Sequence, residues 1–199
     1  MEQIVGKQSI QFQQAAHILS GAAIVGKKEG DGPLGKYFDK IGEEEGLFGC
    51  TSWEEAESNL QKEAVSMAIE KAGIEKWQLR MIYAGDLLAQ TIASSFGIMG
   101  FDTPIYGLYG ACSTMGEALS LSAMAVSGGY APYVAAVTSS HFGSAEKEFR
   151  FPLGYGNQRP LSATWTVTGS GACILGTKGG KARIAGITTG KIVDYGFKD

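Results

Sequence analysis

The sequence has 199 residues, of which 44% are hydrophobic, with 17 basic and 20 acidic residues and a formal net charge of −3. This is enough for one domain with a hydrophobic core, and the glycines follow no period, which excludes collagen and disordered low-complexity chains. The charge provides no general field for nucleic acid or an anionic membrane, and we expect no nucleic-acid partner.

The three cysteines, Cys50, Cys112 and Cys173, are odd in number and widely spaced. They therefore suggest neither a zinc site nor a disulfide framework, and a reducing compartment is the default. The first residues lack the basic and apolar segments of a secretory signal, and the two apolar parts of residues 111–140 are each too short to span a bilayer. We expect neither an export signal nor a transmembrane helix.

Short apolar runs alternate with helical patterns along the chain. Ser52 and Glu55 form a capping box, after which apolar residues recur at helical spacing until Gly73 ends the helix. Residues 27–49 predict a long surface segment and residues 140–164 a long irregular loop. The other elements expected are strands at His17–Gly26, Arg80–Gly85, Pro104–Tyr109, Tyr133–Ser139, Trp165–Leu175 and Ala182–Gly190, and helices at Leu88–Phe96 and Cys112–Ser127.

This order, βαβαβαββ, predicts an α/β fold. Strands separated by helices of this length form a mostly parallel, mixed sheet with helices on its faces. Open α/β sheets usually bind ligands at the carboxyl ends of their strands. Candidate functional residues are therefore those that directly follow a predicted strand.

Cys112 lies in the turn between an expected strand and a helix, and small residues flank it. Backbone N–H groups and the positive end of the helix dipole favour a thiolate there, which makes the sulfur a better nucleophile or hydrogen-bond acceptor. The alternative is that Cys112 packs as a small hydrophobic residue, which is what we expect of Cys50 and Cys173.

Asp86 and His141 also follow predicted strands. The Asp86 carboxylate could contact a ligand, orient a neighbour, or simply cap the next helix. His141 could act as an acid, a base or a donor to an anion, or it could be structural. Arg150 lies in the following loop, whose composition suits a small anion. Residues 169–172, GSGA, lie between β-rich flanks instead of opening a helix, so we expect no nucleotide binding there.

Six short segments, which follow one another along nearly the whole chain, resemble the sequence motifs of a known family. They are Asp31–Gly35 (DGPLG), Ala84–Leu88 (AGDLL), Gly110–Thr114 (GACST), Thr138–His141 (TSSH), Phe149–Pro152 (FRFP) and Thr166–Ala172 (TVTGSGA). Together they resemble the stage V sporulation protein AD family of spore-forming bacteria, within the superfamily of thiolases and β-ketoacyl synthases. The resemblance implies a thiolase-like half fold.

Thiolase-like proteins have two similar halves, and the second half supplies the histidine or asparagine groups that complete catalysis. The resemblance therefore implies that residues 1–199 form the N-terminal domain and that the second half is absent. Surfaces that normally pack on the twin half would then be exposed, and we expect a homodimer or poor solubility.

The family resemblance implies non-catalytic binding of dipicolinic acid (pyridine-2,6-dicarboxylate) and support of its uptake into the developing spore. It also implies a peripheral position at the inner membrane of the forespore or spore, with other stage V sporulation membrane proteins as partners. We expect no cofactor or protein-bound metal, except calcium if dipicolinate binds as its chelate. The expected ligand-binding residues are Cys112, His141, Asp86 and Arg150, because a flat dianion needs positive or N–H donors at both ends.

Two other functions stay open. The first is a condensing enzyme in which Cys112 accepts an acyl group from a coenzyme A or carrier-protein thioester. The second is a scaffold that docks membrane partners and whose pocket is vestigial.

Overall fold

The computed structural model describes residues 3–43, 46–87, 91–149 and 166–197, without the side chains of residues 146–149. Eight described strands form one sheet. The strands are β1 (Ile4–Val5), β2 (Ser9–Val25), β3 (Lys40–Ile41), β4 (Met81–Asp86), β5 (Ile105–Leu108), β6 (Tyr133–Ser140), β7 (Gly169–Gly176) and β8 (Ala182–Thr188). The helices are α1 (Lys27–Gly30), α2 (Trp53–Ala72), α3 (Ile92–Ile98), α4 (Thr114–Ser127) and α5 (Phe142–Phe149), with 3₁₀ turns η1 (Gly35–Tyr37), η2 (Lys76–Gln78), η3 (Met99–Phe101) and η4 (Ala111–Ser113).

The sheet is mixed, as predicted, with the strand order β1-β2-β7-β6-β4-β5. Strand β4 pairs in parallel with β5 and β6, whereas β7 runs antiparallel to both β6 and β2. Strands β7 and β8, which follow each other in the chain, do not pair with each other. Each pairs with β2, so that His17 lies opposite Gly176 of β7 and Arg183 of β8.

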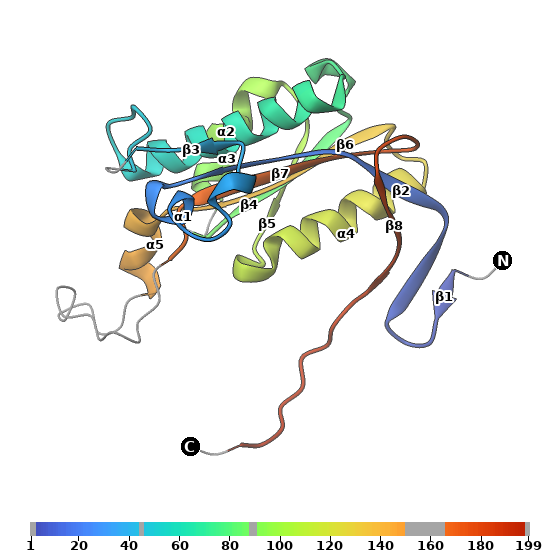
Figure 1. Ribbon diagram of the computed structural model, residues 1–199. Coiled ribbons are helices and arrows are strands. Elements are labelled where there is room, and N and C mark those ends of the chain that lie inside the picture. The colour runs from blue at the N-terminus through green and yellow to red at the C-terminus, as the bar shows by residue number, and fades with distance from the viewer. Residues whose placement is uncertain (1–2, 44–45, 88–90, 150–165, 198–199) are drawn as a thin grey trace.

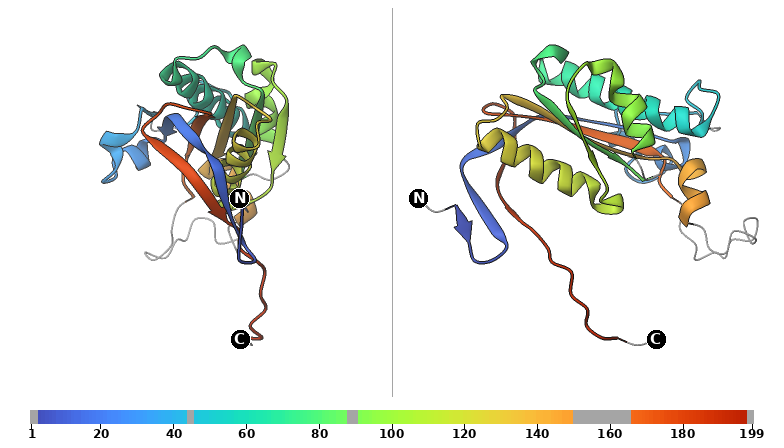
Figure 2. Two further views of the ribbon diagram at one scale, coloured as in Figure 1. Left: turned by 90° about the vertical axis from the view of Figure 1, so that its right-hand side faces the viewer. Right: turned by 180° about the vertical axis from the view of Figure 1, so that it is seen from behind.

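Helices cover both faces of the sheet (Figures 1 and 2). Helices α2 and α3 lie on one face, where Leu60 packs in a core with Ile82 and Ile174 of the sheet. Helix α4 lies on the other face, where Ala118 packs with Val134 and Leu175. The sheet is therefore the middle layer of an α/β sandwich.

The capping pattern of α2 is confirmed in part. Ser52 Oγ accepts the backbone N–H of Glu55 at 3.1 Å, and Gly73 ends the helix with a left-handed φ of 67°. In a capping box the Glu55 carboxylate would accept the N–H of Ser52 itself. Here it accepts the N–H of Thr51, the residue before the cap, at 2.9 Å. The helix start is therefore bonded over two successive residues.

Helix α5 corrects the prediction of an uninterrupted irregular loop after Ser140. Its first turn closes through the Ala145 N–H, which donates to the His141 carbonyl at 2.9 Å. Gly143 in this helix serves close packing, because a Cβ there would lie 2.3 Å from Cδ2 of Trp53. A glycine required by a neighbouring ring cannot be distinguished in a sequence from a glycine in a turn.

Strand β5 ends the described sheet and pairs only with β4. Ile105 on this strand is 41% exposed and Phe96 on the adjacent α3 is 66% exposed. An apolar strand edge of this kind favours pairing with another chain.

No helix in the described ranges is both long and apolar enough to cross a membrane.

We expect this edge to make the chain self-associate, with a light-scattering mass above that of a monomer at micromolar concentrations. Ile105→Lys should shift the mass towards the monomer, because a lysine on an edge strand opposes pairing. The matched control is Ile41→Lys on β3, at a residue of nearly equal exposure, 43%. A monomer at every concentration tested would contradict the expectation.

Candidate functional site

Three predicted site residues lie at the carboxyl edge of the parallel strands. Asp86 ends β4, Cys112 lies in η4 after β5, and His141 directly follows β6. The strand ends are aligned, because Gly85 pairs with Leu108 and Asp86 pairs with Ser139. Figure 1 shows the start of α4 and helix α5 at this same end of the sheet. We call this end the strand edge.

Cys112 is exposed and lies in a tight turn. Ala111 has a left-handed φ of 45°, and both the N–H and the hydroxyl of Ser113 bond the Gly110 carbonyl at 2.8 Å. The Ser113 hydroxyl therefore does not cap α4, which starts at Thr114 without a side-chain cap from the described residues. The thiol and the first N–H groups of α4 are thus close together in the chain at the positive end of the helix dipole.

Gly85 allows this turn to approach the sheet. A Cβ on Gly85 would lie 2.5 Å from Cγ2 of Thr114 and 2.7 Å from the carbonyl oxygen of Leu108. Both distances are shorter than any normal contact, so only glycine fits between β5 and the first residue of α4. The position of Cys112 therefore depends on the absence of a side chain at Gly85.

Asp86 is buried and acts on the start of α3. Its Oδ2 accepts the backbone N–H of Ser94 at 2.9 Å and the Ser94 hydroxyl at 2.7 Å. Its Oδ1 is buried and has no hydrogen-bond partner among the described residues. This arrangement fits the capping role that the sequence allowed, and direct contact of Asp86 with a ligand stays a prediction.

His141 is fully buried, with both ring nitrogens bonded to backbone. Nε2 lies 2.6 Å from the Gly46 carbonyl oxygen, and Nδ1 accepts the N–H of Gly143 at 3.1 Å. Burial lowers the pKa of His141, while the Gly46 carbonyl opposes that change. The ring is therefore a neutral tautomer with its proton on Nε2, stacked 6.4 Å from Trp53. These contacts fit the structural alternative, and a role in ligand binding stays a prediction.

A buried polar network that the sequence analysis missed lies beneath the strand edge. Glu57 of α2 is fully buried, and its two carboxylate oxygens accept the hydroxyls of Ser139 and Ser144, each at 2.8 Å. Gln61, one turn further along α2, donates through Nε2 to Ser139 Oγ at 2.8 Å and to Ser94 Oγ at 3.0 Å. Because Ser94 also bonds Asp86, the network connects two buried carboxyl groups.

Glu57 has a strongly altered acidity. Burial raises its pKa to about 7, the hydroxyls of Ser144 and Ser139 oppose this, and the charges of Asp86 and Glu54 add to it. The three ion pairs found between described residues do not include Glu57 or Asp86. A signal for this network existed in the sequence, since Glu57 and Gln61 lie four residues apart on the same helix face as Leu60 and Ala64.

Arg150, Cys50 and Cys173 are the remaining residues that the sequence singled out. Arg150 lies outside the described residues. Burial raises the thiol pKa of both Cys50 and Cys173, in agreement with the inert role expected of them. No cluster of three or more histidine, cysteine or acidic residues suitable for a metal occurs within the described ranges.

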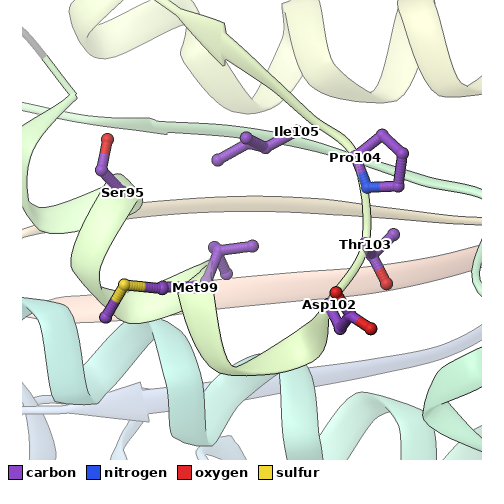
Figure 3. Close-up of a pocket in the computed structure, with 7 residues that line it drawn as sticks. Ser95, Met99, Asp102, Thr103, Pro104 and Ile105 are labelled. Atoms are coloured by element: carbon purple, nitrogen blue, oxygen red, sulfur yellow. The ribbon is translucent and has the colours of Figure 1, made fainter.

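A hollow of about 480 Å³ lies at the other end of β5 (Figure 3). Residues from α3, η3 and the start of β5 line it, among them Met99, Thr103 and Ile105. Cys112, Asp86 and His141 are not part of its lining. This hollow is therefore separate from the strand edge.

Comparison with known proteins assigns the chain to a family. The model of the family "Stage V sporulation protein AD" matches residues 6–199. The chain belongs to the stage V sporulation protein AD family. The stage V sporulation protein AD of Bacillus subtilis (strain 168) is 39% identical over 198 residues, a match that covers 98% of this chain and 58% of that protein. The resemblance that the sequence motifs indicated is confirmed.

Solved structures similar to this family member are condensing enzymes. The priming β-ketosynthase of the R1128 polyketide pathway has a TM-score of 0.55 at 16% identity, over 87% of this chain and 53% of the enzyme. The 3-oxoacyl-[acyl-carrier-protein] synthase III of Aquifex aeolicus VF5 has a TM-score of 0.54 at 15% identity, over 82% and 54%. At such identities the likeness shows the fold alone, and it confirms the thiolase-like half fold. The chain spans somewhat more than half the length of each of these proteins.

Proposed function

We propose that this stage V sporulation protein AD family member binds dipicolinic acid at the strand edge, without catalysis, and supports its uptake into the developing spore. The observation that carries the proposal is the exposed Cys112 turn at the uncapped start of α4, in a chain of a sporulation family. A helix start that lacks a side-chain cap offers N–H groups to an anion. A flat ring with a carboxylate at each end can place one carboxylate there.

Negative charge near the turn bears on the form of the ligand. The Glu117 carboxylate lies beside Gly110, since a Cβ on Gly110 would be 2.7 Å from its Oε2. Glu117 and a dicarboxylate would repel each other unless a cation lies between them. Calcium bound by dipicolinate would supply that cation through oxygen ligands. We therefore expect calcium to strengthen binding.

Calorimetric titration tests the binding proposal. We expect saturable binding of dipicolinate to a full-length family member, and roughly tenfold weaker binding or worse after Cys112→Ala, since one lost polar contact costs about 1.4 kcal/mol. Cys173→Ala is the matched control and should leave the affinity unchanged, because Cys173 pairs with Ala136 in the middle of β6, away from the strand edge. Benzene-1,3-dicarboxylate, which lacks the ring nitrogen, is the control ligand. Equal affinity before and after Cys112→Ala would refute the placement of the pocket.

The condensing-enzyme fold and the exposed thiol favour one alternative function. In that function the Cys112 sulfur attacks an acyl thioester, the acyl group moves to Cys112, and the coenzyme A or carrier thiol leaves with a proton. Incubation with acyl-coenzyme A followed by intact-mass measurement tests it. An acyl mass on wild type but not on Cys112→Ala, with no binding of dipicolinate, would establish this alternative.

We also propose that the chain associates peripherally with stage V sporulation membrane proteins. Membership of a sporulation family supports this association. Capture of those membrane proteins by the full-length family member should depend on dipicolinate if binding and transport are coupled. Capture that needs no ligand and tolerates Cys112→Ala would instead favour a scaffold with a vestigial pocket.

A further inference from the structure

The hydroxyl of Ser144 has one proton and two acceptors. Ser144 Oγ lies 2.8 Å from Oε2 of Glu57 and 3.2 Å from the carbonyl oxygen of His141. Glu57, His141 and Ser144 are all fully buried, so bulk water does not reach these groups to act as an additional donor or acceptor. The ionisation of Glu57 decides which acceptor the hydroxyl serves.

With Glu57 ionised, the carboxylate accepts from both serines and attracts the Ser144 proton, because a charged acceptor is stronger than a neutral carbonyl. With Glu57 protonated, the carboxyl group becomes a donor and needs an acceptor of its own. Ser144 Oγ, already at hydrogen-bond distance, can accept that proton and turn its own O–H towards the His141 carbonyl. Both ionisation states therefore have a complete set of bonds in nearly the same geometry.

We propose that Glu57 is a proton-dependent positioning residue, which reverses its hydrogen bond with Ser144 and so sets the bonding of the His141 carbonyl at the start of α5. The same carbonyl accepts the N–H of Ala145 at 2.9 Å and thereby closes the first turn of α5. A second donor at this oxygen holds the α5 start against the end of β6. The ionisation state of Glu57 is thus coupled to the strand edge through the two contacts of the Ser144 hydroxyl.

The groups around Glu57 favour an uncharged state near neutral pH. Asp86 at the end of β4 and Glu54 on α2 both oppose a negative charge on Glu57. His141, between β6 and α5, is neutral because burial lowers its pKa. Ser94 of α3 carries no charge, and α5 continues through residues 146–148, EKE, whose side chains lie outside the described part. A modest change of pH near 7 is therefore enough to change the state of Glu57.

The consequence for ligand binding rests on the proposed function. If dipicolinate occupies the strand edge, its affinity should differ between the two states of Glu57, because the α5 start lies at that edge. Protonation both removes a buried negative charge beneath the site and adds the second bond to the His141 carbonyl. Both changes favour a dianionic ligand at lower pH.

Two-dimensional NMR of the backbone amides tests the switch without any ligand. In wild type the Ala145 amide should shift with pH, with a midpoint near 7, the pKa of Glu57. In Glu57→Gln, a neutral isostere of the protonated form, the Ala145 amide should stay at its low-pH position across the range. The matched control Glu54→Gln removes a charge one turn away and should keep the titration, with the midpoint moved slightly lower.

Ser144→Ala separates the switch from simple loss of structure. It leaves the Glu57 carboxyl in place but removes the link, so the Ala145 titration should disappear while the Ser139 amide still titrates. An Ala145 titration that persists in Glu57→Gln or in Ser144→Ala would overturn the proposal. In a parallel arm, dipicolinate affinity that falls as pH rises in wild type but not in Glu57→Gln supports the effect on binding. Absence of binding at every pH refutes the proposed function and leaves the NMR result to decide the switch.

Discussion

Replacement of Glu57 by glutamine is expected to abolish the fall in the free energy of unfolding that the ionisation of Glu57 causes in the wild type as the pH rises. The range of this fall runs from pH 4.5 to about 7, which are the pKa values of the Glu57 carboxyl group in the unfolded and in the folded state. The folded state binds the Glu57 proton more tightly than the unfolded state does. Its contribution to stability is therefore complete below pH 4.5 and is lost as the pH rises through about 7. The shift corresponds to about 3 kcal/mol.

His141 acts in the opposite direction over part of this range. Burial lowers its pKa in the folded state, so its contribution is present above its unfolded pKa of 6.5 and is lost as the pH falls below that value. The pH profile of wild type alone therefore combines two effects. The difference between wild type and Glu57→Gln isolates Glu57, because His141 contributes to both proteins.

Urea unfolding at several pH values from about 5 to about 8.5 measures this difference. The two proteins should have similar stability at the low end, and the variant should exceed wild type by up to about 3 kcal/mol at the high end. Glu54→Gln, the control on the same helix, should keep the fall in stability, with its upper limit at a slightly lower pH. Parallel curves for wild type and Glu57→Gln would show that burial does not shift Glu57.

The second large effect is expected from Gly85→Ala. The new methyl group would meet Thr114 Cγ2 at 2.5 Å and the Leu108 carbonyl at 2.7 Å. The carbonyl belongs to β5, so relief of the clash requires β5 or the start of α4 to move. We expect a loss of about 1–3 kcal/mol in stability, as is typical of overpacking. Dipicolinate affinity should fall by roughly tenfold or more, because the Cys112 turn moves with α4.

Gly100→Ala is the matched control for this substitution. Gly100 lies in η3, at the other end of β5, and a Cβ there meets no heavy atom within 4 Å. Alanine should therefore leave both binding and stability nearly unchanged. Thermal unfolding and calorimetry on both variants make the comparison. Full affinity in Gly85→Ala would show that the position of the turn does not matter for the ligand.

Much of the fold could be predicted because its signals are local. The Ser52 cap and Gly73 locate α2, and the alternation of apolar runs with helices predicts the parallel strands. The rule that parallel strands end at one edge was enough to bring Asp86, Cys112 and His141 there. Pairing of both β7 and β8 with β2 was not predictable, because it depends on contacts distant in sequence.

The side-chain environment of the candidate site was harder to predict. A residue at a strand end can face the solvent or the helix layer beneath, and Asp86 and His141 are both buried. Asp86 bonds Ser94 of the next helix, as the capping alternative allowed, whereas Gly46, the partner of His141, comes from a segment that no local pattern connects with His141. Glu57 was missed for a similar reason, since an isolated helix does not reveal which polar residue lies against serines of a distant strand.

The position of β2 has a consequence for folding during synthesis. Strand β2 is made early, yet its partners β7 and β8 lie about 160 residues later in the chain, as the pairing of His17 with Gly176 and Arg183 shows. Contacts so distant in sequence form slowly and leave edges open until the last strands emerge from the ribosome. Until β7 inserts between β2 and β6, each of these two strands has one open edge. Its yield in a cell should therefore depend on chaperones that shield such edges more than on the stability of the finished fold.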